Sequence, residues 1–145
     1  MSGENSDSAF TVILIETTVP FAADDVWSHI GNFFELGKWL DVKCSAVCGS
    51  GKPGSVRRIG DAIIEPLVGA TQRSYTYMQT EGPMASFCYH GTVACEPHGE
   101  AGSKIVYTLV YDHSSMDEDR RVTEKERLTA RFGSAVDTMR AAVMA

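Results

Sequence analysis

The chain has 145 residues, 43% of them hydrophobic and 22% charged, and its formal net charge at pH 7 is −6. This length is enough for one globular domain with a substantial core. The negative charge and the lack of any basic run argue against nucleic acid and an anionic membrane surface as partners.

The sequence begins with a polar stretch, MSGENSDSA, that has neither the basic segment nor the apolar segment of a signal peptide. It predicts a disordered lead over residues 1–9, followed by one domain over residues 10–145. We therefore expect a cytoplasmic protein. Within the domain, residues 10–19 (FTVILIETTV) are rich in β-branched side chains and predict the first strand, which ends at Pro20.

Residues 22–40 predict two short helices. Apolar side chains recur there at mixed spacings of three and four, from Val26 to Trp39. Gly31 and Asn32 interrupt this pattern, because both residues favour turns over helix interiors. We therefore expect the two helices to be separated at Gly31 and Asn32.

From residue 43 the sequence changes to short apolar segments between turn signals such as GSGKPG, EGPM and EPHGEAGS. These spacings are typical of an antiparallel meander. Gly60 and Asp61 predict a two-residue hairpin turn. The strands are expected at about 43–48, 54–59, 62–68, 73–80, 86–96 and 103–112.

The last segment, residues 117–144, predicts one long helix with a single apolar stripe. The side chains on that stripe are Leu128, Phe132, Val136, Met139 and Val143. Two capping boxes compete for its start, Ser115 with Glu118 and Thr123 with Glu126. The predicted sheet must bury one face, and one helix covers only part of it. A cavity, or large side chains, must fill the remaining space.

The four cysteines are Cys44, Cys48, Cys88 and Cys95. In a chain of this kind we expect them to be free thiols. Cys44 and Cys48 would share a strand face but lie roughly 13 Å apart, which is too far to hold one metal ion. We expect neither a metal site nor a cofactor.

Several motifs occur in order along the domain: VPFAADDVWSHIGNF after the first strand, then GSVRRI, IIEPL, SYTY, EGP and FCYHGTV. Together they resemble the START-related helix-grip proteins, most nearly the bacterial polyketide cyclase/dehydratase-like branch, over roughly residues 10–143. The resemblance implies an α+β fold in which a seven-stranded antiparallel sheet wraps around the long C-terminal helix. It also implies a pocket between them for a hydrophobic or aromatic small molecule.

The resemblance further assigns roles to single residues. Glu65 in IIEPL matches a carboxylate that faces the pocket in the family, although Pro66 replaces the usual arginine after it. Tyr77 and Tyr89 match aromatic pocket positions on two neighbouring strands. Tyr107 stands where some members place a pocket acid, so that carboxylate is missing here.

Alternation along the strands extends this set, because every second side chain points to the same face. The side chains that share a face with Tyr77, Tyr89 and Tyr107 are Tyr75, Phe87 and Tyr111, respectively. If Gly60 and Asp61 form a two-residue turn, Arg58 lies on the same face as Glu65. Arg57 is the alternative for the inward-facing arginine. Two plainer readings stay open: the tyrosines fill a solid core, or Glu65 faces solvent because parity through a turn is fragile.

These candidates divide into two groups. For catalysis we predict Glu65 as the proton acceptor, Tyr77 or Tyr89 as an acid or oxyanion donor, and Arg58 as electrostatic support. The predicted ligand-lining side chains are Phe34, Trp39, Tyr75, Phe87, Tyr107, Tyr111, Phe132 and Met139. Phe132 and Met139 would form the pocket floor, since they lie about two turns apart on the helix stripe.

Three functions fit this sequence. The first is an enzyme of cyclase, dehydratase or lyase type that acts on an aromatic or polyketide-like substrate by acid–base chemistry. The second is a non-catalytic carrier or sensor of a hydrophobic small molecule. The third is a protein-interaction module, which would need a large exposed apolar patch that no stretch supplies. We rank them in this order, and a homodimer is left open.

Overall fold

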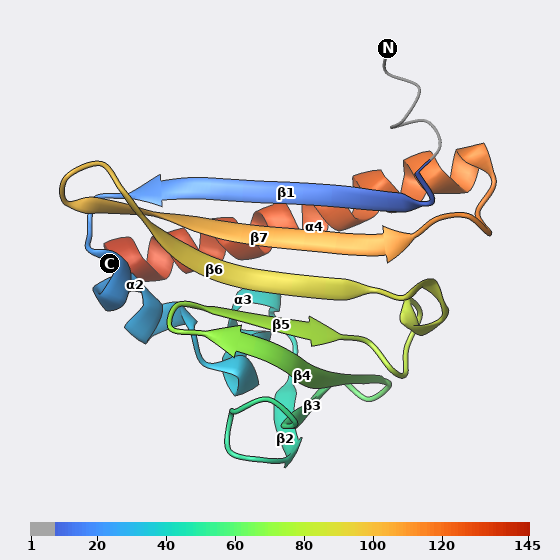
Figure 1. Cartoon of the computed structure of the whole chain (residues 1–145), viewed down its shortest axis with the longest axis horizontal. Helices are drawn as coiled ribbons and strands as arrows, with labels where there is room; N and C mark the ends of the chain where they lie inside the picture. Colours follow the sequence, from blue (N-terminus) through green and yellow to red (C-terminus); the bar gives the residue numbers. More distant parts are fainter. Residues whose placement is uncertain (1–7) are drawn as a thin grey trace.

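The computed structural model describes residues 8–145, so the lead expected at residues 1–9 lies almost wholly outside the described residues. Figure 1 shows a curved sheet with the long C-terminal helix lying along β1 and β7. The elements in chain order are β1 (Phe10–Val19), α2 (Ala23–Ile30), η1 (Phe33–Glu35), α3 (Gly37–Leu40), β2 (Cys44–Cys48), β3 (Val56–Ile59), β4 (Ile63–Thr71), β5 (Ser74–Met78), η2 (Ala85–Phe87), β6 (His90–His98), β7 (Gly102–Asp112) and α4 (Glu118–Met144).

The strands form one seven-stranded sheet in the order β1-β7-β6-β5-β4-β3-β2. Every neighbouring pair is antiparallel, and β1 pairs with β7 along its whole length, from Phe10 opposite Asp112 to Val19 opposite Ser103. α4 packs against β1 and β7, and α3 packs against α4. The predicted helix-grip architecture of the α+β class is confirmed.

The helical segment after β1 differs from its prediction in one respect. α2 forms as expected and buries Val26 and Ile30, but the second predicted helix is divided into η1 and α3. The side chain of Asn32 accepts a hydrogen bond from the backbone N–H of Phe34 at 2.9 Å, which caps η1 as a separate turn. Asp41 then ends α3 in the left-handed conformation, with φ of 55°.

The capping residue of α4 belongs to neither of the two predicted capping boxes. The carboxylate of Asp117 accepts a hydrogen bond from the backbone N–H of Arg120 at 2.8 Å, so neither predicted capping box starts the helix. The predicted apolar stripe is buried at Leu128, Phe132, Val136, Met139 and Val143. No helix among residues 8–145 combines the length and apolar character that crossing a bilayer demands.

The turn between β3 and β4 corrects the prediction for this hairpin. Ile59 pairs with Ile63, so the loop contains three residues rather than two. One extra residue reverses which side chains share a face. Arg57, not Arg58, therefore lies opposite Glu65, and Arg58 is exposed on the outer face.

β6 also begins later than predicted. The strand expected to start at residue 86 starts at His90. The preceding positions are taken by η2 and by Cys88, which is left-handed with φ of 52°. Phe87 consequently lies in a helical turn and Tyr89 directly precedes the strand, so strand alternation does not place the two side chains on one face.

Candidate functional site

A buried ion pair joins β3 to β4. Arg57 has 0% of its surface exposed and Glu65 has 4%. The Nε and Nη2 groups of Arg57 both donate to Oε1 of Glu65, at 2.9 and 2.7 Å, and Nη1 donates to the backbone oxygen of Phe33 at 2.7 Å. Two opposite charges are stable inside a protein only when they are paired and hydrogen-bonded in this way.

Aromatic rings surround the Arg57 guanidinium. Its central carbon lies 4.3 Å from the ring centroids of Phe33 and Tyr77 and 5.6 Å from that of Tyr75. These distances are within the range of cation–π attraction. Tyr75 and Tyr77 alternate on β5 and both point inward, so the two phenols of this strand enclose an arginine.

The environment of the pair changes its proton affinities. Burial raises the pKa of Glu65 above its ordinary value of 4.5, while the charge and hydrogen bonds of Arg57 oppose that rise. Burial lowers the pKa of Arg57, but the neighbouring Tyr75 and Glu65 outweigh this effect, and the arginine stays charged. Glu65 therefore holds a proton more readily than an exposed carboxylate does.

A cavity of about 60 Å³ separates Glu65 from α4. Its polar side chains are Glu65, Tyr77, Gln79, Tyr89, Arg127 and Arg131. Its apolar wall includes Leu36, Leu40, Ile59, Met84, Leu128 and Phe132. This volume holds a few water molecules, whereas pockets for small-molecule ligands usually measure roughly 300–1,000 Å³.

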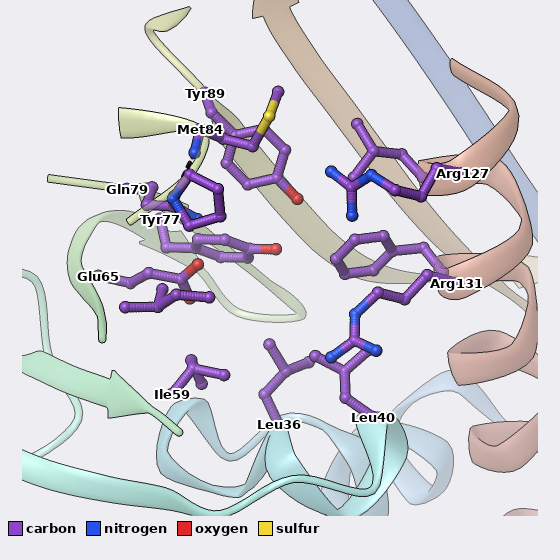
Figure 2. Close-up of a pocket in the computed structure, with 14 residues that line it drawn as sticks. Leu36, Leu40, Ile59, Glu65, Tyr77, Gln79, Met84, Tyr89, Arg127 and Arg131 are labelled. Carbon is purple, nitrogen blue, oxygen red and sulfur yellow. Dashed lines mark hydrogen bonds between the residues drawn. The ribbon is translucent and has the colours of Figure 1, made fainter. Parts of the chain in front are cut away.

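Figure 2 shows the polar side chains converging on the cavity from two sides. Glu65 and Tyr89 reach in from the sheet side, and Arg127 and Arg131 reach in from α4. The Tyr89 hydroxyl points toward the Arg127 guanidinium. Burial raises the pKa of Tyr89 above its ordinary value of 10, so this hydroxyl remains a hydrogen-bond donor at neutral pH.

The loop after β5 closes one side of the cavity. The side-chain oxygen of Gln79, which is buried, accepts a hydrogen bond from the backbone N–H of Met84 at 2.7 Å. Gly82 adopts φ of 131°, and a Cβ there would lie 2.6 Å from the same oxygen, so only glycine fits. This contact fixes the backbone of Met84 beside the cavity.

Tyr107 lies deeper than predicted. Its hydroxyl is hydrogen-bonded to that of Tyr77 at 2.6 Å, and its ring centroid lies 4.9 Å from that of Phe132. Tyr75, Tyr107 and Tyr111 are fully buried but do not line the cavity. The hydroxyls of Tyr75 and Tyr111 have no hydrogen-bond partner among residues 8–145. At these positions the tyrosines fill a solid core.

The division of the second helix changes which side chains reach the cavity. Leu36 and Leu40 line it, whereas the predicted Phe34 and Trp39 line two surface grooves beside α3. Phe34 and Trp39 were predicted because both lie on the segment whose helix edges the pocket in the related family. Because η1 is capped separately, the helical phase changes before Leu36.

Two further predicted residues lie away from the cavity. The Phe87 ring packs against the Arg120 guanidinium, whose central carbon lies 4.9 Å from the ring centroid. Met139 is fully buried but lies about two helical turns beyond Phe132, outside the cavity. Phe132 alone of the predicted helix pair reaches the cavity wall.

The structure thus brings part of the predicted set together. The predicted residues at the cavity are Glu65, Tyr77, Tyr89 and Phe132. Gln79, Arg127 and Arg131 also line the cavity and are absent from the predicted set, whereas Arg57, which binds Glu65, was the stated alternative to Arg58. For the two helix arginines a signal existed, because each directly precedes a residue of the apolar stripe and therefore lies at the border of the buried face.

Neither a metal nor a cofactor site stands out in the part of the chain that the structure describes. No three side chains of His, Cys, Asp or Glu come together there as metal ligands, and the four cysteines are free thiols. The cavity offers Glu65 alone as an acidic group, and its Oε1 is held by Arg57. What this arrangement can perform is proton transfer and hydrogen bonding inside an apolar enclosure.

Comparisons with known proteins agree with this architecture. Residues 13–143 match the model of a family described as polyketide cyclase/dehydrase and lipid transport. No curated protein matches the chain significantly. A solved structure from Nitrosospira multiformis is 18% identical, covers 90% of this chain and 94% of its own, and has a TM-score of 0.76.

Two other solved structures are similar to a comparable degree. A protein from Bacillus thuringiensis is 18% identical, with 93% of this chain and 100% of that chain covered and a TM-score of 0.74. Norcoclaurine synthase from Thalictrum flavum, in complex with dopamine and hydroxybenzaldehyde, is 20% identical, with 93% and 87% covered and a TM-score of 0.69. At these identities the likeness establishes the fold alone.

Proposed function

Because the chain belongs to the polyketide cyclase/dehydrase and lipid transport family, within the START-related helix-grip superfamily, we propose that it binds a small aromatic or apolar compound at the Glu65 cavity and acts on it by proton transfer. The observation that carries the proposal is Glu65 itself, a carboxyl group 4% exposed, with a pKa raised by burial, in the wall of a largely apolar cavity. Such an enclosure orients a substrate, and the raised pKa favours proton exchange closer to neutral pH.

The groups around the cavity have separate roles in this proposal. Both Arg57 donors engage Oε1 of Glu65, so Oε2 is the oxygen that accepts the proton. Tyr89 donates a hydrogen bond to the ligand oxygen on which negative charge develops. The Tyr77 hydroxyl is engaged by Tyr107, so Tyr77 contributes its ring as a wall. Arg57 provides the electrostatic support that was predicted for Arg58.

The size of the cavity restricts the ligand. At about 60 Å³ it must widen before an organic compound enters. Met84 has a flexible thioether side chain, and the exposed Arg131 lies at the cavity mouth, so these two side chains can move aside with the least disruption of the core. We therefore propose a ligand of about one aromatic ring with a short chain. The similarly folded norcoclaurine synthase holds dopamine and hydroxybenzaldehyde, which are compounds of this size.

Deuterium exchange on a simple ketone tests the proposed proton transfer. The probe is 4-phenylbutan-2-one, a neutral aromatic compound whose α-hydrogens exchange with D₂O through an enolate. In the proposed reaction the Glu65 carboxylate takes an α-proton, Tyr89 stabilises the enolate oxygen, and a deuteron from solvent returns to the carbon. Proton NMR measures both the exchange and, by ligand line broadening, the binding.

The variant for this test replaces both members of the ion pair, Arg57→Met with Glu65→Leu, so that no unpaired charge remains in the core. We expect the double variant to fold and to lose at least about 100-fold of the protein-catalysed exchange. Glu126→Gln, which removes an exposed carboxylate from α4, should exchange like the native protein. If the native protein binds the ketone but does not catalyse its exchange, the protein is a non-catalytic carrier. If the native protein does not bind the ketone, the proposal is rejected.

A further inference from the structure

Two arginines on one face of α4 stand at the mouth of the cavity. Arg127 and Arg131 are four residues apart, so one turn of the helix brings their side chains next to each other. Figure 2 shows the Arg127 guanidinium extending from α4 toward Tyr89, and the Arg131 guanidinium extending to the side of the cavity where Leu36 and Leu40 lie.

One of these arginines already binds a carboxylate. Nε and Nη2 of Arg127 donate to the two carboxylate oxygens of Glu124, at 3.1 and 2.9 Å. This is the planar, two-pronged geometry by which arginine recognises a carboxylate. Nη1 of Arg127 forms no hydrogen bond among residues 8–145, and Arg127 lines the cavity.

The other arginine is not engaged in this way. Among residues 8–145, Arg131 forms no ion pair and no side-chain hydrogen bond. The adjoining groove also contains Lys38 and Asp41; Lys38 forms an ion pair with Glu35 at 3.1 Å, and Asp41 forms none among residues 8–145. Arg131 therefore has a full set of donors directed to no partner in the described chain.

The charged side chains that line the cavity itself, Glu65, Arg127 and Arg131, sum to one positive unit. Arg57 neutralises Glu65, and Arg127 neutralises Glu124, so Arg131 remains. This local positive charge contrasts with the formal net charge of −6 of the whole chain. A single positive charge at the edge of an apolar cavity complements a monoanion whose remaining part is apolar.

We infer that the ligand is an aromatic or apolar monocarboxylic acid, whose body occupies the cavity and whose carboxylate binds Arg131 and the free Nη1 of Arg127. This inference rests on the proposed function, because it assumes that the cavity is the ligand site. The body would lie between Leu36, Leu40 and Phe132, and the acid group would remain at the solvent edge. That placement avoids burying the charge of the ligand near Glu65.

Two compounds of the same shape separate charge from fit. The probes are 3-phenylpropanoate and the neutral 3-phenylpropanamide, with affinities measured by NMR titration at low salt. We expect the acid to bind about tenfold more tightly than the amide, and Arg131→Gln to weaken the acid by about three- to tenfold without affecting the amide. Lys125→Gln makes the same change of charge on an exposed part of α4 outside this cavity and should leave both affinities unchanged.

A second variant should have the opposite effect. Glu124→Gln removes the carboxylate that binds Nε and Nη2 of Arg127. The acid should therefore bind more tightly, while the affinity for the amide should stay the same. Raising the salt from about 0.05 to about 0.5 M should weaken binding of the acid alone.

Equal affinities for acid and amide, or an equal loss in Arg131→Gln and Lys125→Gln, would overturn this inference and leave the proposed function standing. Failure of the amide and the acid alike to bind would reject both.

Discussion

Raising the pH above about 10 should unfold the protein in one cooperative step, because all five of its tyrosines are buried. The tyrosines are Tyr75, Tyr77, Tyr89, Tyr107 and Tyr111, and burial raises the pKa of each above its ordinary value of 10. The unfolded chain releases these protons near pH 10, whereas the folded chain retains them. The resulting stability is fully present below pH 10 and is lost as the pH rises further.

The expected size of this effect is large. A tyrosine whose folded pKa lies far above 10, as burial makes it at Tyr77, Tyr89 and Tyr107, contributes about 1.4 kcal/mol for every pH unit above 10. These three amount to about 4 kcal/mol near pH 11, and the whole free energy of unfolding of a domain is roughly 5–15 kcal/mol. Phenolate absorbance in the ultraviolet and circular dichroism should therefore change together, with about three or more protons released per molecule at the transition. Phenolate formation while the circular dichroism stays native would show that the tyrosines are accessible, contrary to the structure.

Arg57→Met alone should lower the free energy of unfolding by about 3–5 kcal/mol, because it leaves Glu65 as a buried charge without a partner. Glu65→Leu alone should cost a similar amount, since Arg57 would then be unpaired among Phe33 and two tyrosine rings. The double variant, Arg57→Met with Glu65→Leu, should return to within about 1 kcal/mol of the native protein. Urea unfolding of the four proteins measures the coupling directly.

The adjacent residue provides the control for this cycle. Arg58→Met removes the same charge from the next position, where the side chain is exposed, and should change stability by no more than about 0.5 kcal/mol. If Arg58→Met is the costly variant and Arg57→Met is not, the register of the hairpin is shifted by one residue. If the double variant loses the sum of the two single losses, the ion pair is not coupled.

The architecture could be predicted from local patterns in the sequence. Which arginine faces Glu65 could not, because it depends on the presence of one additional loop residue. β-branched segments, turn signals and the apolar stripe of α4 each depend on nearby residues, and they predicted the fold. The face on which Arg57 or Arg58 lies depends on whether the loop after Ile59 has two or three residues. Gly60-Asp61 is equally compatible with both lengths, so strand alternation had no fixed starting point there.

The contents of the cavity were predictable only in part. The sequence indicated that Tyr75 and Tyr77 face inward, but inward-facing rings pack around Arg57 as readily as around a ligand. How much space remains is decided by how side chains from distant segments fit together. Arg127 and Arg131 were missed for a related reason: at the border of an apolar stripe, an arginine usually faces solvent. Only the position of α4 relative to the sheet directs them to the cavity mouth.

A titration observed at the methionine methyl groups tests most directly whether the Glu65 cavity is the ligand site. Met84 lines the cavity and is 3% exposed, whereas Met144 is 43% exposed at the end of α4. With methyl-labelled methionine and 4-phenylbutan-2-one as the probe, the Met84 signal should shift in a saturable manner while the Met144 signal stays in place. An unchanged Met84 signal at saturating probe, with or without a shift at Met144, would contradict the account and place the ligand elsewhere.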